Sequence, residues 1–287
     1  MSGAFVIAPD KFKGSLTATQ AAEAIARGIK KVRPDVECRL CPMADGGEGT
    51  VDVFLARGAE AKRVAVRGPL GDPVEATIAL RGDTAILEMS SASGMRLLEP
   101  ARYDPVRADT FGTGQLIEAA LDAGAKRLIV GLGGSATNDA GTGMLRALGV
   151  RFRAADGSEI DGPTTAYERL TSIDLRGLDA RLAGVRVLAA TDVDNPLCGR
   201  DGAARTFAAQ KGANADEIER LDAVLSHVAD VAAATLRRDE RDAPGAGAAG
   251  GLGFALIAFL GATAESGVAL VAREWGLKTL LHGAVVC

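Results

Sequence analysis

The chain has 287 residues, which is enough for two domains of ordinary size, and 47% of them are hydrophobic. A net charge of −4 gives no basic surface for a nucleic acid or an anionic membrane. The sequence has no apolar run of roughly 18 residues and no visible signal peptide, so we expect a cytoplasmic protein without a membrane span. Abundant glycine, few aromatic residues and alternating strand and helix patterns indicate the α/β class.

The first predicted strand, Ala4 to Ala8, ends at a charged loop. This loop contains four side chains that could bind a small acid: Asp10, Lys11, Lys13 and Ser15. A helix is predicted from about Ala18 to Val32, because Thr17 and Gln20 have the spacing of a capping box.

A second strand, Val36 to Cys41, leads into the loop Pro42 to Thr50, where Asp45 and Glu48 stand among three glycines. Ligands of open parallel sheets bind at the carboxyl ends of the strands. Two charged loops at one such edge therefore favour a binding site over two solvated turns.

Cysteine and histidine offer little for catalysis. Cys38 and Cys41 form a C-x-x-C without the second pair that a zinc site needs, so buried thiols are the favoured interpretation. The only histidines, His227 and His282, argue against a histidine-based triad.

The middle of the chain has a different texture. The cluster Gly68 to Pro73 suits a crossing between domains. A hairpin is predicted from Val74 to Leu80 and from Ala85 to Met89, and a helix from Thr110 to Ala123.

The stretch Leu128 to Met144 is the strongest single signal. The apolar run Leu128 to Val130 predicts a strand buried on both faces. Small residues follow it and then a helix from Met144, an arrangement that predicts an anion site for a phosphate, although many such turns bind nothing. The small residues are Gly131, Gly133, Gly134, Ser135, Thr137 and Asn138.

The same stretch also fits a dinucleotide fingerprint through Gly131, Gly133 and Ala136, with Asp156 lying 20 residues further on. Asp139 weakens this alternative, because it would place a carboxylate beside a pyrophosphate. A nicotinamide-dependent oxidoreductase therefore stays open as an alternative.

The final third supplies more candidates. After the strand Val185 to Ala190, Asp192 and Asp194 could bind a divalent cation or merely cap an Asn-Pro turn. Lys211 could clamp a phosphate or lie on the surface. The chain is then predicted to form the following elements: a helix from about Asp216 to Arg237 capped by Asn214, a mobile glycine loop from Gly245 to Gly253 before the helix Leu252 to Leu260, a helix from Arg273 to Leu281 and a strand from Ala284 to Cys287.

Seven ordered motifs resemble those of the type I glycerate kinases, which phosphorylate a hydroxyl of glycerate with ATP, and together they extend over nearly the whole chain. They are APDKFKGS at Ala8–Ser15, PMADGGEGT at Pro42–Thr50, FGTGQLI at Phe111–Ile117, GLGGSATNDAGTGM at Gly131–Met144, DVDNPLCG at Asp192–Gly199, QKGA at Gln210–Ala213 and GAAGGLG at Gly247–Gly253.

The resemblance implies a two-domain α/β fold, with a second α/β domain inserted into a Rossmann-like domain that has a parallel sheet. Residues 1–66 and 268–287 would form the outer domain and residues 67–267 the inserted one, with the active site in the cleft between them. Family members continue beyond the last strand, so we expect this chain to lack a C-terminal part of the outer domain. An inactive ligand-binding remnant is therefore a further alternative.

The resemblance and the residue chemistry together suggest roles. Phosphoryl transfer needs positioning and neutralised charge more than covalent catalysis, which suits a chain rich in Gly, Asp and Lys. We expect Gly133, Gly134, Ser135, Thr137 and Asn138 to cradle ATP, Asp192 to hold Mg²⁺ and Lys211 to neutralise the transferred group. Asp10, Lys11, Lys13 and Ser15 would meet glycerate, and Asp45 or Glu48 would orient its hydroxyl. The sequence leaves a homo-oligomer open.

Overall fold

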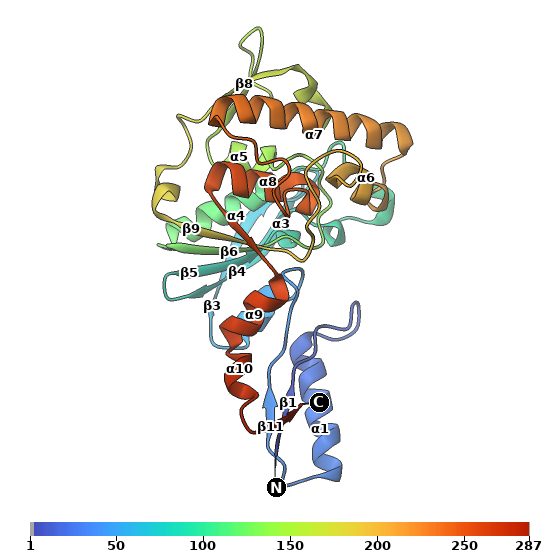
Figure 1. The fold of residues 1–287 in the computed structure, drawn as a ribbon, viewed down its shortest axis with the longest axis vertical. Helices are drawn as coiled ribbons and strands as arrows, with labels where there is room; N and C mark the ends of the chain where they lie inside the picture. Colours follow the sequence, from blue (N-terminus) through green and yellow to red (C-terminus); the bar gives the residue numbers. More distant parts are fainter. Residues whose placement is uncertain (1–2, 287) are drawn as a thin grey trace.

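The computed structural model describes residues 3–286, and Figure 1 shows a large upper body with a narrower extension that holds both chain ends. The extension contains a parallel three-stranded sheet in the order β11-β1-β2, and helix α1 (Ala18–Val32) packs against it. Its strands are β1 (Ala4–Ile7), β2 (Cys38–Leu40) and β11 (Ala284–Val286). The predicted last strand is confirmed, and its end at Cys287 lies outside the described residues.

The large body is built on a six-stranded sheet with the order β10-β9-β6-β5-β4-β3. Strands β5, β6, β9 and β10 are parallel, whereas β3, β4 and β5 form an antiparallel meander. The strands are β3 (Glu60–Arg67), β4 (Pro73–Arg81), β5 (Thr84–Glu88), β6 (Arg127–Gly131), β9 (Arg186–Ala190) and β10 (Thr263–Glu265). The predicted hairpin and the predicted α/β class are therefore confirmed.

Strand β3 belongs to the large sheet, where all of its residues pair with β4. Residues 60–66, which the predicted boundary assigns to the outer domain, are thus joined by hydrogen bonds to the large body. The division into residues 1–66 with 268–287 and residues 67–267 otherwise stays a prediction.

Helices cover both faces of the large sheet. One face packs against α4 (Phe111–Asp122), α5 (Thr142–Ala147) and α8 (Ala248–Leu260), and the other against α2 (Thr50–Leu55) and α9 (Gly267–Trp275). Along β6, Leu128 and Val130 contribute to the first of these cores and Ile129 to the second, all fully buried. The side chains of a strand alternate between faces, so this apolar run is the consequence of two dry faces.

The two long helices begin at the predicted caps. The Thr17 hydroxyl accepts a hydrogen bond from the Gln20 amide. The Thr17 amide donates in turn to the side-chain oxygen of Gln20, which completes a capping box. Asn214 and Glu217 repeat the arrangement at α7 (Ala215–Leu236). The remaining elements are α3 (Ser90–Ser93), α6 (Ala203–Phe207), α10 (Leu277–Leu280), β7 (Arg151–Ala154), β8 (Leu170–Asp174) and the 3₁₀ turns η1 (Met95–Leu97), η2 (Pro100–Arg102), η3 (Thr164–Arg169), η4 (Ala180–Gly184) and η5 (Ala209–Lys211).

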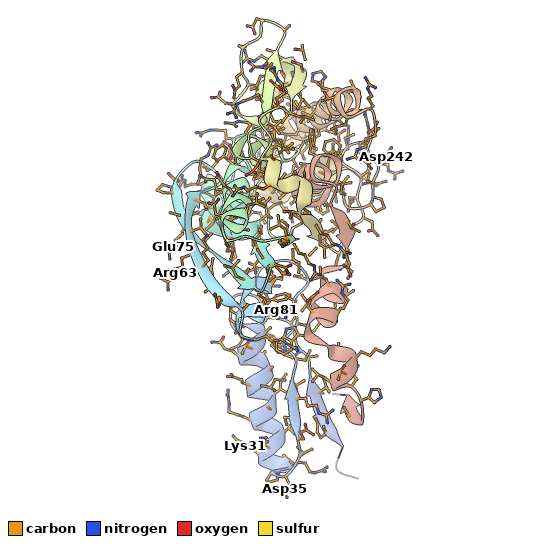
Figure 2. All side chains as sticks on the ribbon, turned by 90° about the vertical axis from the view of Figure 1, so that its left-hand side faces the viewer. Lys31, Asp35, Arg63, Glu75, Arg81 and Asp242 are labelled. Atoms are coloured by element: carbon orange, nitrogen blue, oxygen red, sulfur yellow. The ribbon has the colours of Figure 1, made fainter. Side chains whose placement is uncertain are left out.

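Helix α9 contacts the large sheet through partly buried ion pairs. The Glu274 carboxylate, 12% exposed, accepts hydrogen bonds from Arg81 of β4 at 2.6 Å and Arg127 of β6 at 2.8 Å. Figure 2 labels Arg81 at this junction. The two ion pairs hold α9 against β4 and β6. Between residues 3 and 286, no helix combines the length and hydropathy that a membrane span needs.

Candidate active site

The loops that follow β2 and β6 cross backbone to backbone. A Cβ on Gly131 would lie 2.2 Å from the carbonyl oxygen of Gly46, and one on Gly133 would lie 2.6 Å from the Cα of Gly47. Only glycine permits this approach, so these positions bring the acidic loop of the extension against the glycine turn of the large sheet. The loop after β2 and the loop after β6 therefore lie directly against each other.

A cavity of about 290 Å³, here called the inner cavity, opens where these loops meet. Seven of the predicted site residues line it: Lys13, Asp45, Gly133, Gly134, Ser135, Asp192 and Lys211. They come from loops after β1, β2, β6 and β9 and from the turn η5, which follows α6. The carboxyl ends of the strands thus gather in one place side chains that are nearly 200 residues apart in the sequence.

A second cavity of about 280 Å³, the outer cavity, lies between the loop after β1 and helix α2. Its lining includes Asp10, Lys11, Lys13, Ser15 and Glu48. Lys13 lines both cavities, so they are adjacent at this residue.

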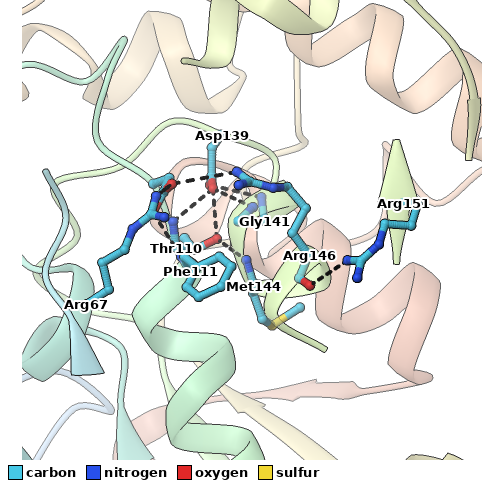
Figure 3. Close-up of polar contacts among 10 residues, drawn as sticks. Arg67, Thr110, Phe111, Asp139, Gly141, Met144, Arg146 and Arg151 are labelled. Atoms are coloured by element: carbon cyan, nitrogen blue, oxygen red, sulfur yellow. Dashed lines mark hydrogen bonds and ion pairs between the residues drawn. The ribbon is translucent and has the colours of Figure 1, made fainter. Parts of the chain in front are cut away.

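Asp139 shapes the turn after β6 from the inside. Its carboxylate, 3% exposed, accepts hydrogen bonds from the amides of Thr110, Gly141 and Gly143 and from the Thr110 hydroxyl, all at 2.8 to 3.0 Å (Figure 3). The amide of Met144 donates to the same hydroxyl. The N-terminus of α5 is therefore occupied by the protein's own groups. The expectation that this helix end binds a phosphate is wrong.

A layer of paired charges supports Asp139 from behind. Figure 3 shows Arg67 and Arg146 on either side of Phe111, with guanidinium carbons 4.6 and 5.6 Å from the ring centre. Both arginines pair with Asp109. Burial and the neighbouring Asp139 raise the pKa of Asp109, whereas the two arginines oppose this rise. This layer holds the start of α4 against the glycine turn.

Thr137 and Asn138 are fully buried, and neither lines the inner or the outer cavity. The hydroxyl of Thr137 donates to the Ala249 carbonyl at 3.4 Å, and a Cβ on Gly250 would lie 2.0 Å from the Thr137 carbonyl oxygen. The glycine loop 245–253 packs over both residues, and their contact with a ligand stays a prediction. That loop was expected to be mobile, but it is mostly buried and packs tightly here.

Lys211 is the most constrained charge of the inner cavity. It is 2% exposed, and its Nζ donates to the Thr137 carbonyl at 2.6 Å. Burial lowers the pKa of Lys211 to about 7, although the Asp139 carboxylate works in the opposite direction. A buried lysine with one protein acceptor retains two protons with which it can meet an anionic ligand.

The acidic loop holds Asp45 and Glu48 in different surroundings. Asp45 Oδ1 accepts from the Gly47 amide at 2.9 Å and lies 3.5 Å from the Lys11 ammonium. Glu48 pairs with Arg96, which the large body contributes from η1. The free oxygen of Asp45 is therefore the more available acceptor.

Glu88, at the end of β5, fixes the same loop from the sheet. It is 7% exposed, and its Oε1 accepts from the Val51 amide at 2.6 Å, at the start of α2. Burial raises the pKa of Glu88 to about 7, and the hydrogen bond from Val51 opposes this rise.

Asp192 is exposed on the inner cavity, and Asp45 lines the same cavity. Within residues 3–286, no group of three or more His, Cys, Asp or Glu side chains could hold a metal by itself. Mg²⁺ commonly uses one or two carboxylates together with substrate phosphates, so this donor set fits a Mg²⁺ carried by a nucleotide. Asp194 is exposed and lines neither cavity.

Asp156, the ribose ligand of the oxidoreductase alternative, lies in the turn after β7, in a separate two-stranded sheet. It accepts hydrogen bonds from the amide and hydroxyl of Ser158. The carboxylate thus stabilises its own turn and not the edge of the sheet that carries β6. Cys41 is buried, Cys38 half-buried, and both are free, in keeping with the prediction of buried thiols.

Sequence reasoning missed Glu88, Arg96 and Phe207, and Phe207 lines the inner cavity. Phe207 stands four residues before Lys211, which was the available signal. Arg96 and Glu88 carry no local pattern that marks them, because their partners are distant in the sequence.

Comparison with known proteins agrees with this geometry. Residues 5–287 match the model of the Glycerate kinase family. The chain is 49% identical over 282 residues to a glycerate kinase of Bacillus subtilis, covering 97% of this chain and 74% of the relative. It is 46% identical over 280 residues to the glycerate 2-kinase of Escherichia coli, covering 96% and 74%.

A crystal structure from Salmonella typhimurium LT2, assigned as a glycerate kinase 2, superposes with a TM-score of 0.92 at 44% identity. It covers all of this chain, which in turn covers 78% of that protein. The order of motifs, the fold and the sequence relatives agree. The chain belongs to the glycerate kinase family.

Proposed function

We propose that this protein transfers the γ-phosphoryl group of ATP to a hydroxyl of glycerate where the inner and outer cavities meet. One observation carries the proposal: Lys13 lines both cavities, between a glycine turn suited to phosphates and a loop suited to a small acid. Transfer in line between two bound groups requires such adjacent sites.

The phosphates of ATP would lie on the turn Gly133 to Ser135. Within the described residues, the amides of these three residues donate no backbone hydrogen bond, and Gly134 has a φ of 76°. Successive amides that point outward from such a turn form a concave anion site without the help of a helix end. Lys211 supplies the charge that the transferred group requires.

Glycerate would occupy the outer cavity, with its carboxylate near Lys11 or Lys13 and its hydroxyls near Asp10 and Ser15. Asp45 would accept the proton of the attacking hydroxyl, because Glu48 is already paired with Arg96. Bound with the nucleotide, Mg²⁺ would neutralise phosphate charge, and Asp192 is the side chain placed to hold it.

The test is a coupled assay of ADP release with D-glycerate and Mg-ATP, together with identification of the phosphorylated acid. Replacing Lys13 by Ala should lower kcat/KM for glycerate about 10-fold or more, since a charge-assisted hydrogen bond to the substrate is lost. Lys31→Ala, at the far end of α1 in Figure 2, is the matched control and should retain wild-type rates. Absence of glycerate-dependent ADP release from the wild-type chain would contradict the proposal.

A further inference from the structure

The inner cavity is lined by polar and by apolar residues. The proposed function assigns the turn Gly133 to Ser135 and Lys211 to the phosphates. Five other residues of the lining are apolar: Met95, Leu132, Val193, Phe207 and Ala249; they stand beside the charged or polar Lys13, Asp45, Thr191, Asp192 and Gln210. A triphosphate has no use for apolar lining residues, but a nucleobase does.

Phe207 is the one aromatic residue of this lining. It ends α6, and its neighbours Ala203, Ala204 and Ala208 are fully buried, whereas Phe207 itself is half-buried. The short turn η5 (Ala209–Lys211) directly follows it and ends at Lys211. The aromatic ring and the buried ammonium are therefore held by one rigid segment and face one cavity.

The ring of Phe207 also makes no aromatic contact within the described residues. In the part of the chain that the structure describes, it takes part in no aromatic pair and no cation–π contact, whereas Phe111, Phe152 and Phe254 do. In a chain with only 4% aromatic residues, a half-buried ring that lines a cavity is a candidate surface for stacking with a ligand. Stacking on such a face suits any purine.

From this placement we infer that Phe207 forms the nucleobase-binding site. The purine ring of the nucleoside triphosphate stacks on its phenyl ring. The inference rests on the proposed position of the phosphates at Gly133–Ser135 and Lys211. It adds the chemical class recognised by the aromatic residue of the same cavity.

Calorimetric titrations with ATP and with inorganic tripolyphosphate separate recognition of the base from recognition of the phosphates. Phe207→Ala should weaken ATP binding about 10-fold and leave tripolyphosphate binding unchanged, because only ATP carries a base. Phe207→Tyr keeps the ring and should retain the ATP affinity. Phe259→Ala removes a half-buried ring of α8 outside the cavity and should leave both affinities unchanged.

Lys211→Met distinguishes the nucleobase-binding site from the phosphate site, since it should weaken the binding of both ATP and tripolyphosphate. If Lys211→Met leaves tripolyphosphate binding unchanged, the proposed phosphate site is wrong. A second outcome concerns Phe207 alone. If Lys211→Met behaves as expected, but Phe207→Ala weakens the binding of both ligands equally or of neither, only the nucleobase-binding site is overturned. Thermal unfolding of Phe207→Ala and Phe207→Tyr checks that both variants are folded when they are titrated.

Discussion

The loops after β6 and after β1 are both rich in polar residues, but they use them in opposite ways. After β6, Thr137, Asn138 and Asp139 are at most 3% exposed, and Asp139 accepts four hydrogen bonds from the chain itself. After β1, Asp10 and Lys13 are exposed, and the bridge between Phe12 and Leu16 closes the loop.

This difference separates residues that shape the backbone from residues that can contact a ligand. The buried Asp139 carboxylate is satisfied by the chain itself, and it therefore determines the path of the backbone after β6. Exposed charges cost little to leave free and can pair with a ligand when it arrives. A motif contains both kinds of residue, and burial decides which kind each one is.

Replacing Lys211 by Met is the largest perturbation of the buried kind. The loss of the ammonium should lower kcat by about 10³-fold, which is comparable to the removal of an oxyanion-stabilising donor. Initial rates at saturating ATP and glycerate measure it. The matched control is Lys62→Met, which removes a lysine of β3 whose Nζ donates to the Ala119 carbonyl of α4. It should change kcat less than twofold. A similar loss in both variants would make the effect structural.

The acidity of Lys211 adds a pH signature. Burial lowers its pKa to about 7, so the ammonium of the free enzyme is lost as pH rises through 7. We expect kcat/KM for ATP to fall above about pH 7. In kcat the decline should come at a higher pH, because the bound phosphates stabilise the protonated form of Lys211. The Lys211→Met variant should lack this decline, and a wild-type profile that is flat from pH 6 to 9 would contradict the assignment.

Asp139→Ala should act on stability next most strongly. It leaves the buried amides of Thr110, Gly141 and Gly143 without an acceptor, and Lys211 without its nearest counter-charge. We expect a loss of about 3 kcal/mol in the free energy of unfolding, measured with urea. Asp161→Ala removes an exposed carboxylate and should cost less than about 0.5 kcal/mol. Equal midpoints for the two variants would show that Asp139 does not organise the turn.

Sequence reasoning found the elements whose signals are local. The caps at Thr17 and Asn214 begin the predicted helices because the capping side chains act within four residues. The buried strand Leu128–Val130 and the hairpin of β4 and β5 likewise carry their patterns in a few consecutive residues. The charged loops at the carboxyl edge could be placed together because parallel topology requires it.

The rest depends on partners far along the chain. Strand β3 was missed because its exposed charges obscure the alternation, and only its pairing with β4 defines it. Thr137 and Asn138 were expected at the ligand because the glycine loop that covers them is more than 100 residues away. Phe207 and Glu88 have meaning only once the cavity and helix α2 are in place.

Glu88 connects the two kinds of loop, and its titration gives the smallest and most specific effect. It is buried like Asp139, yet through the Val51 amide it holds the acidic loop that carries the exposed Asp45. Burial raises its folded pKa to about 7 from an ordinary value near 4.5, so the folded state binds the extra proton between these two values. Stability contributed by this group is therefore complete below about pH 4.5 and is lost as pH rises through 7.

Glu88→Gln cannot titrate but keeps an oxygen for the Val51 amide. We expect the variant to match the wild type at pH 5 within a few tenths of a kcal/mol and to exceed it by about 1–2 kcal/mol at pH 8, since only the wild type must then bury a charge. Urea unfolding at both pH values measures the difference, and Glu118→Gln, on the exposed side of α4, should show none. A wild-type advantage at pH 8 would instead mean that the carboxylate is stabilised by the amides of α2 more than burial disfavours it. The acidic loop would then be held by a charge and not, as the burial of Glu88 suggests, by a hydrogen bond alone.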